Sequence, residues 1–280
     1  MAEFRVLLDE RVLVESPRWH DDRLVFSDWG AQEIVAVDLT GASEVVATVR
    51  AMPFCLDRTP TGELLVVAGS QLLRRTPAGE LEPVADLSGV ATTPWNDIVV
   101  DGRGNAYVNN IGFDFPGGEF APGLVALVQP DGSVRPVADG LAFPNGMAVS
   151  PDGSTLIVAE SYANRLTGYT IESDGTLSQQ RVWAELGDGS APDGIGVDAE
   201  GAVWYASVPG RRCVRVREGG EVLQTVPADR GCFACTLGGP DGTTLFAVAA
   251  DWNAVMAGGG ARTGQVLVTD VDVPAAGWPR

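Results

Sequence analysis

The chain has 280 residues, 45% hydrophobic and 20% charged, with 35 glycines and 18 prolines, which is the composition of a soluble globular protein rich in turns. Its net charge of −18 disfavours binding to nucleic acid or to an anionic membrane, and the expected partner is a small molecule. All 19 basic residues are arginine and His20 is the only histidine, which excludes lysine Schiff-base chemistry and a zinc site built on two or three histidines.

Six short β-rich segments recur along the chain, and most of them follow a glycine-containing turn. They are residues 23–28, 63–68, 105–110, 155–160, 202–207 and 244–249. Equivalent positions in these segments, 40, 42, 50, 47 and 42 residues apart, are Leu24, Leu64, Ala106, Leu156, Val203 and Leu245. A period in the forties with several strands per unit predicts an all-β, six-bladed β-propeller that occupies residues 1–280 as a single domain.

The two ends of the chain are predicted to close the ring. The apolar segment 4–8 matches a last strand at residues 265–269, so we expect both segments to lie in one blade. The two longest repeat spacings predict inserted loops, one at residues 113–122 and one at residues 161–191.

The first residues of the inner strands are expected to converge on the central channel. Counting back nine to eleven residues from each equivalent position gives Glu15, Cys55, Asn96, Asn145, Asp193 and Cys235. Four of these six side chains are oxygen donors, and hard divalent cations such as Ca²⁺, Mg²⁺ or Mn²⁺ prefer such donors. The alternative is that the Asn-Gly and Asp-Gly pairs are turn residues without a ligand.

Four motifs resemble those of the SMP-30/gluconolactonase family, also called regucalcin-like or LRE. They are Glu15-Ser-Pro-Arg-Trp, Trp95-Asn96-Asp97, Phe143-Pro-Asn145-Gly-Met and Ala191-Pro-Asp193-Gly-Ile. The resemblance covers nearly the whole chain and implies a six-bladed propeller with one divalent metal ion, Ca²⁺ first, with Mg²⁺, Mn²⁺ or Zn²⁺ as alternatives. It implies that Glu15, Asn145 and Asp193 bind the metal, that Asn96 is a further ligand or a substrate contact, and that Asp193 is the catalytic base.

One position departs from the family pattern. Sugar-lactonase members carry an arginine two residues before the position of Asn96, and this chain has Pro94 there, followed by Trp95. The implied activity is therefore a metal-dependent hydrolase of a lactone or ester less polar than a sugar lactone. Trp95, Phe113, Tyr162 and Cys55 are expected to bind the substrate together with Asn96, and further aromatic candidates for the pocket rim are Phe54, Phe115 and Trp252.

Three other functions remain compatible with this sequence, because propellers carry many activities. They are phosphotriester hydrolysis, a non-hydrolytic biosynthetic reaction, and metal binding without catalysis. The start of the chain, Met1-Ala-Glu-Phe-Arg, lacks the apolar stretch of a signal peptide, which predicts a cytoplasmic protein. Its four cysteines, including the C-x-x-C pair Cys232 and Cys235, are then expected to be reduced, buried thiols.

Overall fold

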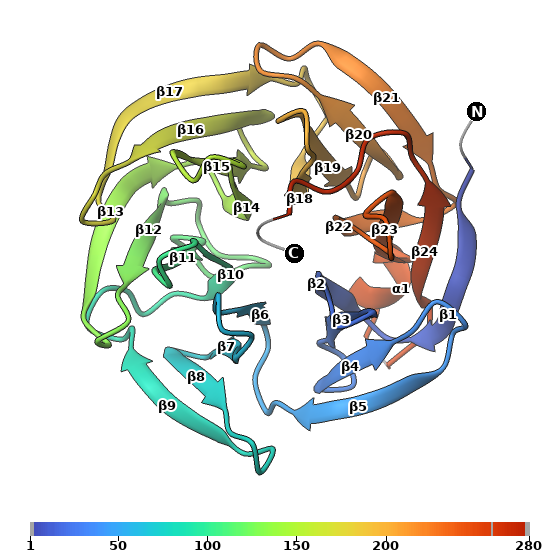
Figure 1. Cartoon of the computed structure of the whole chain (residues 1–280), viewed down its shortest axis with the longest axis horizontal. Helices are drawn as coiled ribbons and strands as arrows, with labels where there is room; N and C mark the ends of the chain where they lie inside the picture. The colour runs from blue at the N-terminus through green and yellow to red at the C-terminus, as the bar shows by residue number, and fades with distance from the viewer. Residues whose placement is uncertain (1–2, 259, 278–280) are drawn as a thin grey trace.

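A computed structural model describes residues 3–258 and 260–277. It shows six four-stranded antiparallel sheets arranged around a central channel, which confirms the predicted all-β, six-bladed propeller (Figure 1). Blade 1 consists of β2 (Val14–His20), β3 (Arg23–Asp28), β4 (Glu33–Val37) and β5 (Ser43–Thr48). Blade 2 consists of β6 (Phe54–Arg58), β7 (Leu64–Ala68), β8 (Gln71–Arg75) and β9 (Leu81–Asp86). Blade 3 consists of β10 (Trp95–Val100), β11 (Ala106–Asn110), β12 (Gly123–Val128) and β13 (Val134–Leu141).

The second half of the ring follows the same order from the channel outward. Blade 4 consists of β14 (Pro144–Val149), β15 (Thr155–Glu160), β16 (Arg165–Ile171) and β17 (Leu177–Glu185). Blade 5 consists of β18 (Pro192–Val197), β19 (Val203–Ser207), β20 (Arg212–Val216) and β21 (Val222–Pro227). Blade 6 consists of β22 (Gly231–Gly238), β23 (Thr244–Ala250), β24 (Gly264–Asp270) and β1 (Arg5–Arg11), with the short helix α1 (Trp252–Met256) between β23 and β24.

The ring is closed by strands from the two ends of the chain, as predicted. β1 pairs with β24 in antiparallel register, with Arg5 opposite Val268 and Val6 opposite Leu267. Figure 1 shows β1, in blue, beside β24, in red. Blade 6 is complete only when both ends are in place, so opening this pair would expose the edge of β24.

The hydrophobic core lies between neighbouring blades. One buried cluster joins Val14 and Phe26 of blade 1 to Val248 of blade 6, and Trp19 stacks on Phe246 across the same boundary at 5.1 Å. The second strand of each blade is among the most buried elements, and every residue of β11, β19 and β23 is buried. Burial on both faces explains why these strands appear in the sequence as continuous apolar runs.

One of the two predicted loops is wrong. Residues 113–122 do form a connection, between β11 and β12, but most of residues 161–191 belong to β16 and β17. These two strands have 7 and 9 residues, so the extra length in this repeat lengthens the outer strands of blade 4. Within the described part of the chain, no helix is long and apolar enough to span a membrane.

Candidate functional site

Four predicted oxygen-donor residues meet at one end of the channel. Glu15, Asn96, Asn145 and Asp193 each occupy the second position of an inner strand, in β2, β10, β14 and β18. They lie together on the wall of one cavity of about 580 Å³. Residues separated by up to 178 positions in the chain therefore share one site, because four blades place the same strand position at the channel. We call these four residues the floor of the cavity.

Each floor residue lies at an irregularity in its strand. The pairing between the inner strand and its neighbour shifts between Glu15 and Arg18, Trp95 and Asp97, Pro144 and Met147, and Pro192 and Ile195. Such bulges bend a strand and redirect a side chain. An irregularity of this kind lies at or beside each of the four floor residues that line the cavity.

Two glycines allow the inner strands to approach each other closely at the floor. A Cβ atom added to Gly146 would lie 2.5 Å from the backbone nitrogen of Ile195, and one added to Gly194 would lie 2.2 Å from the Cβ of Ala234. The Asn145-Gly146 and Asp193-Gly194 pairs lie within β14 and β18, so the alternative that they form turns is wrong. Their glycines are required for packing between blades.

The oxygen atoms of the floor are only partly satisfied. The Nδ2 of Asn96 donates to the Oδ1 of Asn145 at 3.0 Å, and the backbone nitrogen of Ser16 donates to the Oε2 of Glu15 at 3.0 Å. The Oδ1 of Asp193 is buried and has no hydrogen-bond partner among the described residues. An unpaired buried carboxylate oxygen is costly and normally has a cation or donor beside it.

Burial and repulsion by neighbouring carboxylates raise the pKa of both carboxyl groups of the floor. Burial raises the pKa of Glu15 to about 8, and the nearby charge of Asp97 adds to this increase. Burial, followed by the charge of Glu15, raises the pKa of Asp193 well above its usual range. Two buried carboxylates and two amide oxygens at one point fit a hard divalent cation, because the charge of the cation would stabilise both ionised groups.

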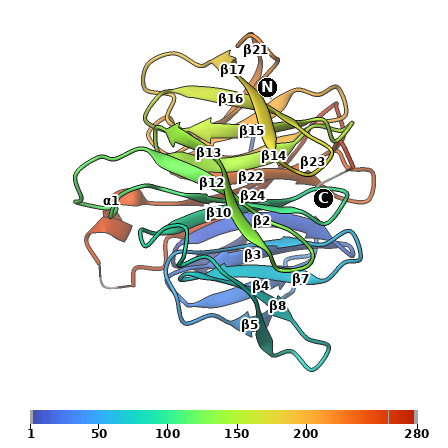
Figure 2. The ribbon, with the colours of Figure 1, turned by 90° about the vertical axis from the view of Figure 1, so that its left-hand side faces the viewer.

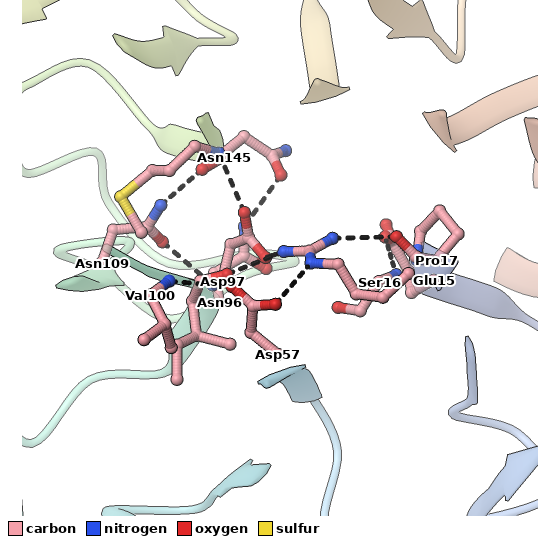
Figure 3. A network of polar contacts seen from close by, with 12 residues as sticks. Glu15, Ser16, Pro17, Asp57, Asn96, Asp97, Val100, Asn109 and Asn145 are labelled. Atoms are coloured by element: carbon pink, nitrogen blue, oxygen red, sulfur yellow. Dashed lines mark hydrogen bonds and ion pairs between the residues drawn. The ribbon is translucent and has the colours of Figure 1, made fainter. Parts of the chain in front are cut away.

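A buried ion-pair network lies next to the floor residues (Figure 3). Arg18 of β2 lies 3.3 Å from Asp57 of β6 and 3.6 Å from Asp97 of β10. Asp97 also accepts a hydrogen bond from the backbone nitrogen of Met147 at 2.9 Å, and Asp57 accepts one from Val100 at 2.8 Å. The network therefore joins blades 1 to 4 next to the floor.

Sequence reasoning missed this network, although a signal was present. Arg18, Asp57 and Asp97 are charged residues within apolar inner-strand segments, where an unpaired charge is very unfavourable. Burial raises the pKa of Asp97 to about 6, while the positive charge of Arg18 acts in the opposite direction. Charged residues in three inner strands indicate that they pair with one another in the channel.

The predicted substrate-binding residues divide into two groups. Tyr162 and Asn96 line the cavity, as do the rim candidates Phe115 and Trp252. Trp95 and Cys55 instead pack in a core cluster between blades 2 and 3. Phe54 packs between blades 1 and 2. Phe113 lies behind the cavity wall, against Phe115 and Tyr162.

In blade 6 the predicted channel position is displaced. β22 has its irregularity between Cys232 and Ala234, so Phe233 lines the cavity, whereas Cys235 lies deeper, beside Arg18 and Asp97. All four cysteines are buried free thiols, as expected.

The cavity walls above the floor are apolar. Glu15 and Asp193 are the only charged side chains among the described residues that line it. The apolar wall residues include Trp29, Met52, Phe115, Phe143, Phe233, Trp252, Val255 and Met256. Ser161 lines the wall as well, but its hydroxyl already donates to the backbone oxygen of Pro192 at 2.7 Å and accepts from Asn145 at 3.2 Å. The site therefore combines a polar floor with walls that offer few hydrogen bonds.

Fold and site together define a six-bladed propeller with a cluster of oxygen donors at one end of its channel. The family model described as "SMP-30/Gluconolactonase/LRE-like region" matches residues 13–251. The chain belongs to this family, as its motifs predicted.

Named relatives include lactonases. The chain is 27% identical over 253 residues to regucalcin of Danio rerio, covering 88% of this chain and 85% of the relative. It is 27% identical over 195 residues to a pentonolactonase of Haloferax volcanii, covering 67% and 65% of the two chains. It is 30% identical over 146 residues to a gluconolactonase of Zymomonas mobilis, covering 47% and 39%. The family therefore includes lactone hydrolases.

Solved structures show the same fold. A luciferin-regenerating enzyme superposes with a TM-score of 0.83 at 20% identity, covering 98% of this chain and 97% of the other. A calcium-binding regucalcin from Agrobacterium tumefaciens superposes with a TM-score of 0.81 at 22% identity, covering 98% and 95%.

Proposed function

We propose that this protein is a metal-dependent hydrolase that opens a lactone, or cleaves an ester, less polar than a sugar lactone. The observation that carries the proposal is the convergence of Glu15, Asn145 and Asp193, with Asn96 beside them, at the bottom of an otherwise apolar cavity. Glu15, Asn145 and Asp193 would hold one divalent cation, with Asn96 as a further ligand or a contact to the substrate. Ca²⁺ suits these oxygen donors, and a calcium-binding regucalcin shares the fold.

The residues of the floor supply the acid–base part of the reaction. When bound, the cation contributes Lewis-acid polarisation of a carbonyl oxygen. Asp193 accepts a proton from the attacking water at its free Oδ1, and the water oxygen forms the new bond to the carbonyl carbon. The ring carbon–oxygen bond breaks, and its oxygen takes up the proton that Asp193 accepted, which gives a hydroxy acid and restores the Asp193 carboxylate. The apolar walls limit the access of other water molecules.

The polarity of the walls selects against a sugar lactone. Asn96 and Asn145 already bond to each other, and Ser161 already bonds to Pro192 and Asn145. Pro94 lines the cavity where the resemblance places an arginine in sugar lactonases. Each sugar hydroxyl left without a partner in such a cavity would cost about 1–3 kcal/mol. An apolar substrate avoids this cost.

A hydrolysis screen with a pH indicator tests the proposal. It compares aliphatic, aromatic and sugar lactones and a phosphotriester, with and without a chelator, for the wild type and for Asp193→Asn. Asp188→Asn is the matched control, because Asp188 is an exposed carboxylate in the same segment of the chain. We expect turnover of apolar lactones that the chelator and Asp193→Asn abolish. Turnover of the phosphotriester alone, or of no compound while a metal is bound, would contradict the proposal.

A further inference from the structure

Two segments from opposite blades meet above the cavity. The connection between β11 and β12 belongs to blade 3, and α1 follows β23 in blade 6, on the other side of the channel in Figure 1. Figure 2 shows α1 and the green segment before β12 projecting from the same end of the propeller. Their side chains Phe115 and Trp252 both line the cavity, with ring centroids 6.4 Å apart and an interplanar angle of 16°. The two rings thus lie nearly parallel and come from opposite blades.

Each of these two rings is supported by another aromatic side chain of the wall. Phe115 lies 5.0 Å from Phe143, and Phe113 meets it edge-on at 6.4 Å. Trp252 lies 5.8 Å from Phe233. The side chain of Asp251 caps α1 by accepting from Asn253 at 3.0 Å, which fixes the start of the helix that carries Trp252. The near-parallel arrangement of Phe115 and Trp252 is therefore supported on both sides.

The two rings lie close enough to contact the same substrate ring. A planar ring inserted between two others needs ring planes about 7 Å apart, twice the ~3.5 Å optimal carbon–carbon contact. The 6.4 Å between the two centroids keeps both side chains within reach of one planar ring at the cavity wall. A saturated ring of the same carbon skeleton is puckered and thicker, so it would force the two rings further apart.

We propose that Phe115 and Trp252 determine the specificity of the site by holding a planar, uncharged aromatic ring of the substrate between them. This inference rests on the proposed function, which places the ester bond at the floor. It narrows the substrate class to lactones or esters that carry an aromatic ring. Because Glu15 and Asp193 are the only charged groups among the described lining residues, the cavity offers no partner for an anionic substituent on that ring.

The test compares dihydrocoumarin with octahydrocoumarin, in which the aromatic ring is saturated and the leaving group is an alcohol instead of a phenol. In the wild type we expect kcat/KM to favour dihydrocoumarin about tenfold beyond the ratio of the two uncatalysed alkaline hydrolysis rates, the order expected from two added aromatic pairs. Phe115→Leu and Trp252→Leu each remove one of these pairs, so each should lower this excess about threefold. Phe120→Leu is the matched control, because Phe120 is an exposed residue of the same connection that contacts Phe113 and Tyr162. Phe115→Tyr keeps the ring and should keep the preference.

A binding experiment separates failure of this inference from failure of the proposed function. 2-Tetralone and 2-decalone are the ketone counterparts of the two lactones and have no ester bond. Their dissociation constants, measured by calorimetry, therefore report the preference for an aromatic ring without hydrolysis. Tighter binding of 2-tetralone to the wild type and Phe115→Tyr, lost in folded Phe115→Leu and Trp252→Leu, supports the inference even if neither lactone is hydrolysed. Equal binding of the two ketones, binding of neither, or selectivity that both leucine variants retain would overturn it.

Discussion

The buried arginine next to the floor gives the sharpest prediction about stability. In Arg18→Met the methionine keeps much of the side-chain volume but removes the charge that faces Asp57 at 3.3 Å and Asp97 at 3.6 Å. The side chain of Arg18 is 10% exposed and that of Asp57 is 2% exposed, so solvent cannot replace the lost partner. Breaking a buried pair in this way costs about 3–5 kcal/mol. We expect the free energy of unfolding to fall by that amount.

Urea denaturation followed by tryptophan fluorescence measures this loss. Arg217→Met is the matched control, because Arg217 and Glu221 form an ion pair whose side chains are 59% and 63% exposed. Exposed pairs contribute less than about 1 kcal/mol. Adding Asp57→Asn to Arg18→Met should recover part of the loss, since it removes an unpaired buried charge. Equal losses in Arg18→Met and Arg217→Met would refute the reasoning that the network stabilises the channel.

Two further predictions concern the floor. Gly194→Ala places a Cβ 2.2 Å from that of Ala234 and should cost about 1–3 kcal/mol, whereas Gly102→Ala, with open space around it, should change stability by less than about 1 kcal/mol in the same urea assay. Loss of stability in both variants, or in neither, would argue against close packing of β18 on β22. Removal of divalent metal should lower the Tm of the wild type in calorimetry, because a ligand that binds only the folded state stabilises it. Glu15→Gln should reduce this shift, and a Tm that does not respond to chelator or added Ca²⁺ would contradict a metal at the floor.

The sequence predicted the ring and four floor residues because both depend on repetition. In blades 1 to 5 the inner strand begins nine to eleven residues before the next strand, so Glu15, Asn96, Asn145 and Asp193 share a strand position that can be counted. The same count misses the cavity in blade 2, where Cys55 packs in the core. It also misses it in blade 6, where the irregularity of β22 places Phe233 at the cavity and Cys235 below it. A shift of one or two residues in pairing register leaves no clear trace in an apolar run.

The upper walls of the cavity could be predicted only in part. Phe115, Tyr162 and Trp252 are recognisable as aromatic residues near strand ends, but their positions depend on connections that have no periodic pattern. The contact between Phe115 and Trp252 joins segments 137 residues apart in the chain, and only the closed ring brings them together. Residues 161–191 were predicted to be a loop but are mostly strand. Added length in a repeat can extend strands as well as loops, and the spacing alone does not distinguish the two.

The most direct test of the central claim is the rate of dihydrocoumarin opening by chelator-treated protein as a divalent cation is added back. We predict that chelation abolishes the hydrolysis rate. Adding Ca²⁺ or another divalent cation should restore the rate, which should reach its maximum at one cation per chain. Asp193→Asn should lower the saturated rate by at least about 100-fold, the usual contribution of a general base. A rate that survives both chelation and Asp193→Asn would contradict the account.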